Sequence, residues 1–287
     1  MICGSCTAPA EKAAKSWIEL NELPHSIIAG RMDSEWKNNL RRYLTLNWVF
    51  PKLDGFVCIS EPLAELARKH NETAKMITVP ILSDWTEVEE VPHAEDAAHP
   101  FIFHAGTLTV EKDGILTVLE AFGKFHQNRT SPLRFEFSNK RTLPSVKSQM
   151  DAIIERYGVR DKVTFHNHLS KEALDRKFRE CTMVIINKPN NLRNSYNFST
   201  KLGECMSYHL PIITTAVGES ARYLHHGRNA LVIQDANDAD EIAGHIAALV
   251  DHPERRADLG DQAAATARTH FHYSAHQAAL YTYFQQL

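Results

Sequence analysis

The residues of this chain best suited to chemistry lie at positions 199–204, Ser-Thr-Lys-Leu-Gly-Glu. An apolar run at 183–186 predicts a buried strand shortly before them. Ser199 and Thr200 can cap a helix, whose first backbone amides and dipole suit an anion, above all a phosphate. Glu204, one turn further on the same face, can accept hydrogen bonds from two ribose hydroxyls. The stretch therefore predicts a nucleoside diphosphate lying along a helix.

A purely structural interpretation of these residues stays open. Lys201 and Glu204 have the spacing of a solvated ion pair, and Ser199 with Thr200 would then be an ordinary helix cap. Under the phosphate-binding interpretation, Lys201 adds a positive charge at the start of the helix.

A second candidate phosphate site follows a predicted strand at 101–105. Gly106 turns out of this strand, and Gly114 precedes a helical pattern at 115–125. A strand, a glycine and a helix in this order present phosphate-binding amides in Rossmann-type domains. Lys112 can reach the same phosphates, although a solvated loop lysine also explains that residue taken alone.

Strands and helices alternate from residue 101 onward, which predicts an α/β fold with a parallel sheet covered by helices on both faces. Ligands of such sheets bind at the carboxyl ends of the strands, where residues 166–168, His-Asn-His, would border the base of a nucleotide. The expected strands are 133–137, 162–165, 182–186, 211–215 and 230–233, and the expected helices are 143–157, 170–180, 199–208, 219–225, 238–250, 253–268 and 273–286.

The first part of the chain predicts a smaller unit, with a helix at 8–16 and strands at 17–20, 55–60 and 76–81. Ser60 followed by Pro62 has the order of a cap and a first-turn proline, which predicts the start of another helix. The acidic segment 84–100 has no apolar period and is interpreted as a linker. We therefore divide the chain into 1–95, 96–270 and a C-terminal helix at 271–287.

Residues 34–50 have apolar side chains at the spacing of an amphipathic helix, namely Trp36, Leu40, Tyr43, Leu44 and Trp48, with Lys37, Arg41 and Arg42 on another face. A basic helix with Trp and Tyr suits an anionic membrane surface. A helix packed on a sheet explains the same stripe and is the favoured interpretation. The alternative places the protein peripherally at the inner face of a membrane.

Composition narrows the class of protein. The 43% hydrophobic and 23% charged residues are those of a soluble globular protein, and a net charge of −3 argues against a nucleic-acid partner. Five scattered cysteines indicate reduced thiols and a cytoplasmic location. Cys3 and Cys6 form one isolated Cys-x-x-Cys pair, and no Asp-x-Asp motif flanked by apolar strand residues predicts a metal.

The run Phe-Ser-Thr-Lys-Leu-Gly-Glu-Cys-Met at 198–206, followed by Pro-Ile-Ile-Thr-Thr at 211–215, resembles the nucleotide-sugar motif of retaining GT-B glycosyltransferases of family 4 (group 1). The resemblance implies a GT-B fold, with a complete Rossmann-like C-terminal domain and a partial N-terminal domain. It implies donor contacts by Asn197, Phe198, Ser199, Thr200, Lys201 and Glu204, and by Gly106 and Lys112. Catalytic residues stay unassigned.

Three positions depart from the family. Its motif has a first glutamate where this chain has Tyr196, and an arginine on the diphosphate where this chain has Thr107. Lys112 and Lys201 are therefore the expected diphosphate cations. His209 stands where the family usually has glycine in a left-handed helix cap, so a strained or altered turn is expected.

The resemblance implies an enzyme that transfers a sugar from a UDP- or GDP-sugar, without a metal or other cofactor, to a glycan or lipid acceptor. A non-catalytic nucleotide-sugar-binding module or partner subunit is the alternative, and a GT-B epimerase is a further one. Because the family's opening strands have no counterpart in this sequence, we expect the chain alone to transfer sugar poorly. The sugar, base, acceptor and oligomeric state stay open.

Overall fold

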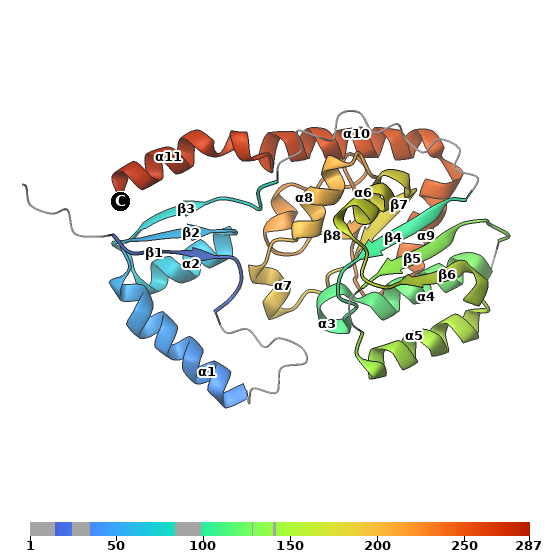
Figure 1. Cartoon of the computed structure of the whole chain (residues 1–287), viewed down its shortest axis with the longest axis horizontal. Helices are drawn as coiled ribbons and strands as arrows, with labels where there is room; N and C mark the ends of the chain where they lie inside the picture. Colours follow the sequence, from blue (N-terminus) through green and yellow to red (C-terminus); the bar gives the residue numbers. More distant parts are fainter. Residues whose placement is uncertain (1–14, 25–34, 84–98, 128, 140–141) are drawn as a thin grey trace, which may run out of the picture.

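The computed structural model describes residues 15–24, 35–83, 99–127, 129–139 and 142–287. Within them, two parallel sheets form two lobes (Figure 1). The smaller sheet has the order β1-β2-β3 and the larger one β6-β5-β4-β7-β8-β9, so the predicted α/β fold is confirmed. The strands are β1 (Trp17–Leu20), β2 (Gly55–Cys58), β3 (Lys75–Thr78), β4 (Phe101–Ala105), β5 (Arg134–Ser138), β6 (Val163–His166), β7 (Met183–Ile186), β8 (Ile212–Thr215) and β9 (Leu231–Ile233).

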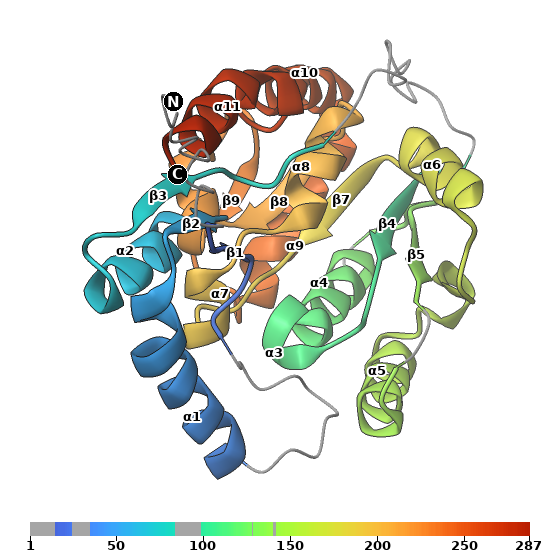
Figure 2. The same ribbon diagram turned by 60° about the vertical axis from the view of Figure 1, so that its left-hand side comes forward.

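Helices cover both faces of the larger sheet, as the alternation of elements requires. One buried apolar cluster joins the sheet to α4, α5 and α9, and the cluster on the opposite face joins it to α6, α8 and α10. Figure 2 shows α10 and α11 following one another along one side of the molecule. The helices are α1 (Glu35–Leu44), α2 (Glu61–His70), α3 (Val110–Asp113), α4 (Ile115–Gln127), α5 (Pro144–Tyr157), α6 (Lys171–Glu180), α7 (Leu192–Tyr196), α8 (Thr200–Ser207), α9 (Ala239–Asp251), α10 (Pro253–His270) and α11 (Gln277–Gln286).

The order of the larger sheet creates a topological switch point between β4 and β7. The chain leaves β4 toward β5 and β6 on one side and leaves β7 toward β8 and β9 on the other. β7 is buried along its whole length, which its sequence Met-Val-Ile-Ile allows. Side chains that follow β4 and β7 therefore meet at one crevice, the usual ligand site of such sheets.

Two local predictions are corrected and one is confirmed. Residues 219–225 were expected to be an α-helix, but the segment forms the short 3-10 helix η4 (Gly218–Arg222). The Asn-rich segment was expected to be a loop, yet it contains α7, because the Asn191 side chain accepts a hydrogen bond from the Asn194 amide and caps it. His209 has φ +56, so the expected strained turn is confirmed.

The helix predicted at 34–50 is present as α1, continued by the π-helix η1 (Thr45–Val49) and the 3-10 helix η2 (Phe50–Lys52). The favoured interpretation of its apolar stripe is wrong. Trp36 and Trp48 are each 63% exposed, and Leu40 and Tyr43 are exposed as well. Among the described residues, α2 fills the face of the small sheet through Leu63, Ala64 and Ala67, and nothing covers the stripe of α1.

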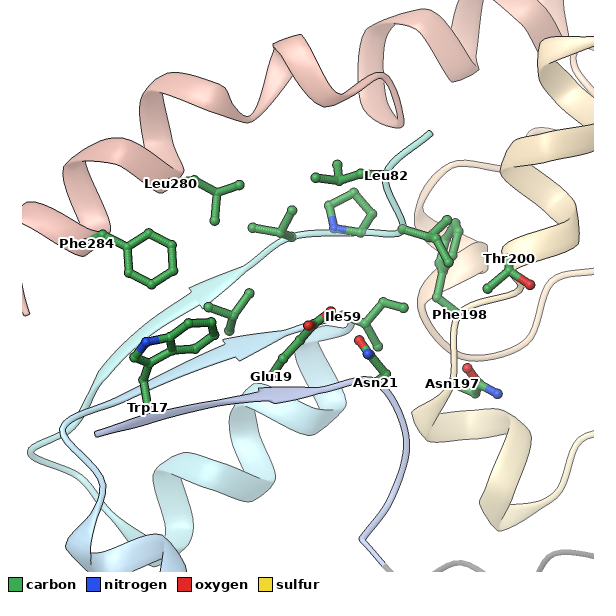
Figure 3. Close-up of a pocket in the computed structure, with 14 residues that line it drawn as sticks. Trp17, Glu19, Asn21, Ile59, Leu82, Asn197, Phe198, Thr200, Leu280 and Phe284 are labelled. Atoms are coloured by element: carbon green, nitrogen blue, oxygen red, sulfur yellow. The ribbon is translucent and has the colours of Figure 1, made fainter. Parts of the chain in front are cut away.

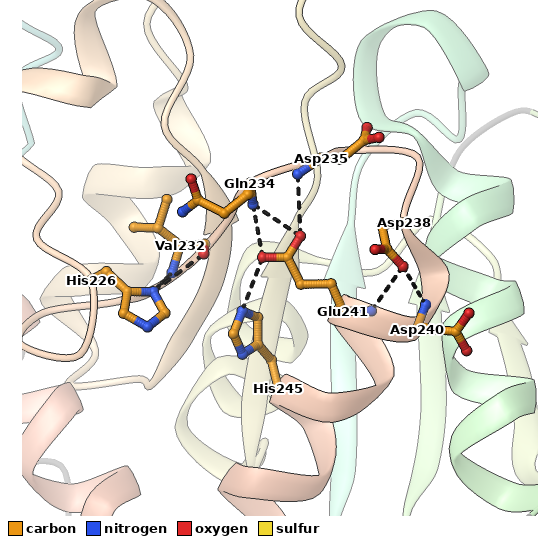
Figure 4. Close-up of polar contacts among 8 residues, drawn as sticks. All are labelled: His226, Val232, Gln234, Asp235, Asp238, Asp240, Glu241 and His245. Carbon is orange, nitrogen blue, oxygen red and sulfur yellow. Dashed lines mark hydrogen bonds and ion pairs between the residues drawn. The ribbon is translucent and has the colours of Figure 1, made fainter.

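The turn between β9 and α9 is held by carboxylates rather than by apolar packing (Figure 4). Asp238 caps α9 by accepting hydrogen bonds from the amides of Asp240 and Glu241. Glu241 in turn accepts hydrogen bonds from the amides of Gln234 and Asp235. These contacts are those of a capped helix and fix the loop at the carboxyl end of β9.

Hydrogen bonds join the two lobes at the start of α2. Ser60 caps α2, as predicted, and its hydroxyl donates to the Tyr196 carbonyl oxygen at 2.7 Å. The Glu61 amide donates to the buried Glu219 carboxylate at 2.8 Å. At the other end of the small sheet, the Tyr283 hydroxyl of α11 donates to the Lys75 carbonyl oxygen of β3 at 3.3 Å. Cys3, Cys6, most of the predicted linker and most of the predicted helix at 8–16 lie outside the described residues, and residues 15 and 16 are not helical.

Candidate functional site

The start of α8 carries free backbone donors. Ser199 is the N-cap residue, but its side chain accepts no cap hydrogen bond, so the expected capping role of its hydroxyl is wrong. Within the described residues, the amides of Ser199, Thr200 and Lys201 have no hydrogen-bond acceptor. Such amides are the donors that an anion accepts at a helix start.

Gly106 and Lys201 come together at the switch point. Gly106 has φ +123, which side-chain-bearing residues rarely adopt, and a β-carbon there would lie 2.8 Å from both Cε and Nζ of Lys201. Lys201 Nζ lies 3.4 Å from His104 Nε2 and 3.5 Å from Asp113 Oδ1. The glycine predicted for phosphate binding thus provides the space that the predicted lysine occupies.

Four cations gather in this crevice, and we name them the cation cluster: Lys112, Lys188, Arg193 and Lys201. Lys112 lies on α3 and Lys201 on α8, while Lys188 is the second residue after β7 and Arg193 lies on α7. Mutual charge repulsion lowers the pKa values of Lys112 and Lys188 in addition to burial. The carboxylates nearby are Asp113, which is buried, and Glu22, whose Oε2 lies 3.8 Å from a terminal nitrogen of Arg193.

In the cation cluster, Lys188 lacks a partner within the described part of the chain and Arg193 is only partly satisfied. Lys188 is only 7% exposed, and its ammonium makes no hydrogen bond or ion pair among the described residues, although Thr215 holds its backbone. The buried Nε of Arg193 has no hydrogen-bond partner in the same part of the chain. Buried charges without partners are costly, so the cluster is suited to an anion that neutralises it.

The titration of the cluster follows from its geometry. Burial, with repulsion from Lys112, Lys201 and Arg193, lowers the pKa of Lys188 to about 8. Burial alone would raise the pKa of Asp113, but the neighbouring cations, first among them Lys201, hold it below its usual range. His104 is neutral, because burial and Lys201 lower its pKa to about 3.

Glu204 lies one turn into α8 and remains accessible to solvent. Partial desolvation by the surrounding protein raises the pKa of its carboxyl, and the charge of Lys201 opposes that shift. No hydrogen bond to another described residue occupies the carboxylate, which leaves both oxygens available as acceptors. The predicted order of phosphate at the helix start and ribose one turn deeper fits this arrangement.

The other residues predicted to contact the donor do not all face the same space. Asn197 and Thr200 border a cavity between the lobes, whereas the Phe198 ring is buried against Phe271 at 5.2 Å between ring centroids. Phe198 therefore anchors the loop in the core. Tyr196, at the position of the family's first glutamate, packs against the same apolar cluster and gives its carbonyl to Ser60. His166, expected to border the base, is 2.7 Å from Glu136 and belongs to an ion-paired structural group.

Lys188 and Arg193 are functional candidates that the sequence reasoning missed. The available signal was the position of Lys188 two residues after a strand that borders the switch point. Arg193 gave no such signal, because it is brought to the crevice by α7, a helix too short to detect in a polar segment. Across the described ranges, no group of His, Cys, Asp and Glu side chains has the arrangement of a metal site.

Two parallel sheets facing one another, with free helix-start amides and cations at the switch point of the larger one, define a nucleotide-binding α/β protein of the two-lobed type. The family model described as "Glycosyl transferases group 1" matches residues 86–266. The chain belongs to this family of glycosyltransferases.

Similarity to individual proteins supports the same fold. Over 119 residues the chain is 29% identical to a D-inositol 3-phosphate glycosyltransferase of Arthrobacter sp. (strain FB24), a match over 42% of this chain and 27% of that protein. Anabaena Alr3699/HepE, solved with UDP-glucose, superposes with a TM-score of 0.73 at 14% identity over 94% of this chain and 72% of the other. Sucrose-phosphate synthase of Thermosynechococcus elongatus gives 0.71 at 14% identity, over 94% and 67%. The fold is thus the GT-B fold, and the chain matches only about a quarter of the length of the curated relative.

If a diphosphate binds at this site, we expect Lys188 to make its affinity dependent on pH. The ammonium, with a pKa of about 8, is stabilised by a bound anion. Raising the pH through about 8 should therefore weaken UDP binding, and near pH 8 binding should take up protons. Titration calorimetry in two buffers of different ionisation enthalpy measures this uptake.

The matched variants are Lys188→Met, which should bind UDP without proton uptake at pH 8, and Lys171→Met on the exposed surface of α6, which should behave as wild type. Equal proton uptake by the wild type and Lys188→Met would contradict the assignment.

Proposed function

We propose that this chain is the donor-binding part of a retaining glycosyltransferase that transfers a sugar from a UDP- or GDP-sugar to a glycan or lipid acceptor. Residues 96–270 would bind the donor and 1–95 would face the acceptor, with 271–287 returning to the first lobe. Family membership supports the transferase class. A relative of this fold was solved with UDP-glucose and another, Staphylococcus aureus TarM, with UDP, which supports the choice of donor.

The observation that carries the proposal is the cation cluster at the start of α8 with Glu204 one turn deeper. In this arrangement the amides of Thr200 and Lys201 receive one phosphate of the donor, and Lys112 and Lys201 balance the diphosphate charge. Glu204 accepts hydrogen bonds from the ribose hydroxyls. The same polar groups hold the leaving nucleotide after the sugar departs, because charge develops on the diphosphate as the glycosidic bond breaks.

The two halves of this site should respond differently to substitution. Glu204→Ala should weaken uridine and UDP alike by about 1–3 kcal/mol, because the ribose hydroxyls lose their acceptor. Lys112→Ala and Lys201→Ala should weaken UDP far more than uridine, because uridine carries no phosphate. Calorimetry with both ligands measures the difference, and Glu172→Ala on α6 is the matched control for Glu204. Unchanged UDP affinity in Glu204→Ala, or equal losses of both ligands in the lysine variants, would exclude these roles.

A transferase and a non-catalytic module differ in the fate of the bound nucleotide sugar. If the chain is a transferase, it should release UDP or GDP from at least one nucleotide sugar when an acceptor is present, and Glu204→Ala should slow this release. Tight nucleotide-sugar binding with no release across a panel of acceptors would favour the non-catalytic module. Conversion of the donor into an epimer would favour the epimerase.

We also propose that the exposed stripe of α1 contacts a membrane surface. Its support is the exposure of Trp36, Leu40, Tyr43 and Trp48 on an element that also carries Lys37, Arg41 and Arg42. No helix among the described residues has the length and apolar character needed to cross a bilayer.

The membrane contact predicts co-flotation of the protein with phosphatidylglycerol vesicles, with less flotation on phosphatidylcholine, because the helix is basic. Trp36→Glu and Trp48→Glu should reduce flotation at least tenfold. Tyr281→Glu, at an exposed position of α11, should not. Flotation equal for all three variants would exclude α1 as the contact.

A further inference from the structure

A cavity of about 470 Å³ lies between the small sheet and α11 and reaches the donor loop. Its floor is the face of β1 and β2 opposite α2, and α11 borders it through Leu280 and Phe284 (Figure 3). Trp17 closes the far end, with its ring edge-on to Phe284 at 5.0 Å between centroids. The proposed donor site meets this cavity at one end only, through Asn197, Phe198 and Thr200.

The lining changes character along the length of the cavity. The end at Trp17, Leu280 and Phe284 is apolar, whereas Glu19 and Asn21 lie toward the end that is shared with Asn197 and Thr200 (Figure 3). Thr200 is the first residue of α8, where the proposed diphosphate binds. The polar end of the cavity therefore opens directly onto the donor site, and the apolar end points away from it.

Glu19 and Asn21 argue for a ligand with hydroxyl groups. The side chains of both residues are exposed and make no hydrogen bond or ion pair within the described residues. A protein helix covering this face would bury the Glu19 charge without a partner, which is costly. Water alone would leave the large apolar side chains at the other end exposed. An occupant with an apolar body and a hydroxyl-bearing head satisfies both ends.

We infer that this cavity is the acceptor site and that the acceptor is amphiphilic. Its apolar chain lies between the small sheet and α11, and its hydroxyl-bearing head lies at Glu19 and Asn21, facing the donor at Thr200. The inference rests on the proposed transferase function, which makes the bound amphiphile an acceptor. Binding of the amphiphile to the cavity does not itself require the donor. It narrows the acceptor from a glycan or lipid to a glycolipid-like molecule.

The test uses alkyl maltosides below their micelle concentrations, measured by calorimetry on the full chain. Dodecyl maltoside should bind and maltose should not, and affinity should rise from octyl to dodecyl maltoside by up to about fourfold per methylene as the chain is buried. Leu280→Glu should weaken dodecyl maltoside at least tenfold. Tyr281→Glu, on the same helix but outside the cavity, and Trp48→Glu, on the exposed stripe, should leave it unchanged.

Glu19→Ala tests the orientation of the head, because it should weaken every maltoside by the same factor and leave the gain per methylene intact. Loss of binding in Trp48→Glu instead of Leu280→Glu, equal binding by all variants, or no effect of Glu19→Ala would overturn the inference. UDP titration of each variant separates the two claims. Normal maltoside binding without UDP binding would remove the donor assignment alone, and the reverse result would remove the acceptor cavity alone.

Discussion

The gathering of four wholly or partly buried cations at the switch point is the constraint on which the rest of this structure depends. Lys112, Lys188, Arg193 and Lys201 meet where β4 and β7 diverge, with the buried carboxylate of Asp113 among them. The fold supports this concentration of charge with a glycine that leaves space for Lys201 and with Thr215, which fixes the backbone of Lys188. An anion that neutralises the cluster is the simplest physical reason for holding these four cations together.

The cluster also explains how this chain departs from its family. At the positions where the resemblance expects a diphosphate arginine and a first motif glutamate, this chain has Thr107 and Tyr196. In the structure Arg193 lies among the other cations from a different helix, and Tyr196 has become part of the contact between the lobes through Ser60. Thr107, in the loop after β4, carries no positive charge. Arg193 on α7 supplies one on the opposite side of the switch point.

Most of the fold followed from periodicity, because buried parallel strands such as β7 are continuous apolar runs with clear ends. The donor helix and Glu204 were placed by the same local reasoning. The side chains of Lys188 and Arg193 were not, since their meeting with Lys112 depends on strand order and on the five-residue helix α7. The burial of the stripe on α1 was mispredicted, because helical spacing shows that a face is apolar but not that something covers it.

The central claim is that the cation cluster, to which Arg193 belongs, holds the donor diphosphate, and a rescue experiment tests it most directly. Thr107 is exposed, so an arginine can be placed there without disturbing the core. We predict that Arg193→Ala weakens UDP binding at least tenfold with little effect on uridine. Adding Thr107→Arg to that variant should recover most of the loss, and Thr107→Lys should recover less, because only arginine contacts phosphate through two parallel hydrogen bonds. Unchanged UDP affinity in Arg193→Ala, or no recovery in the double variant, would contradict the account.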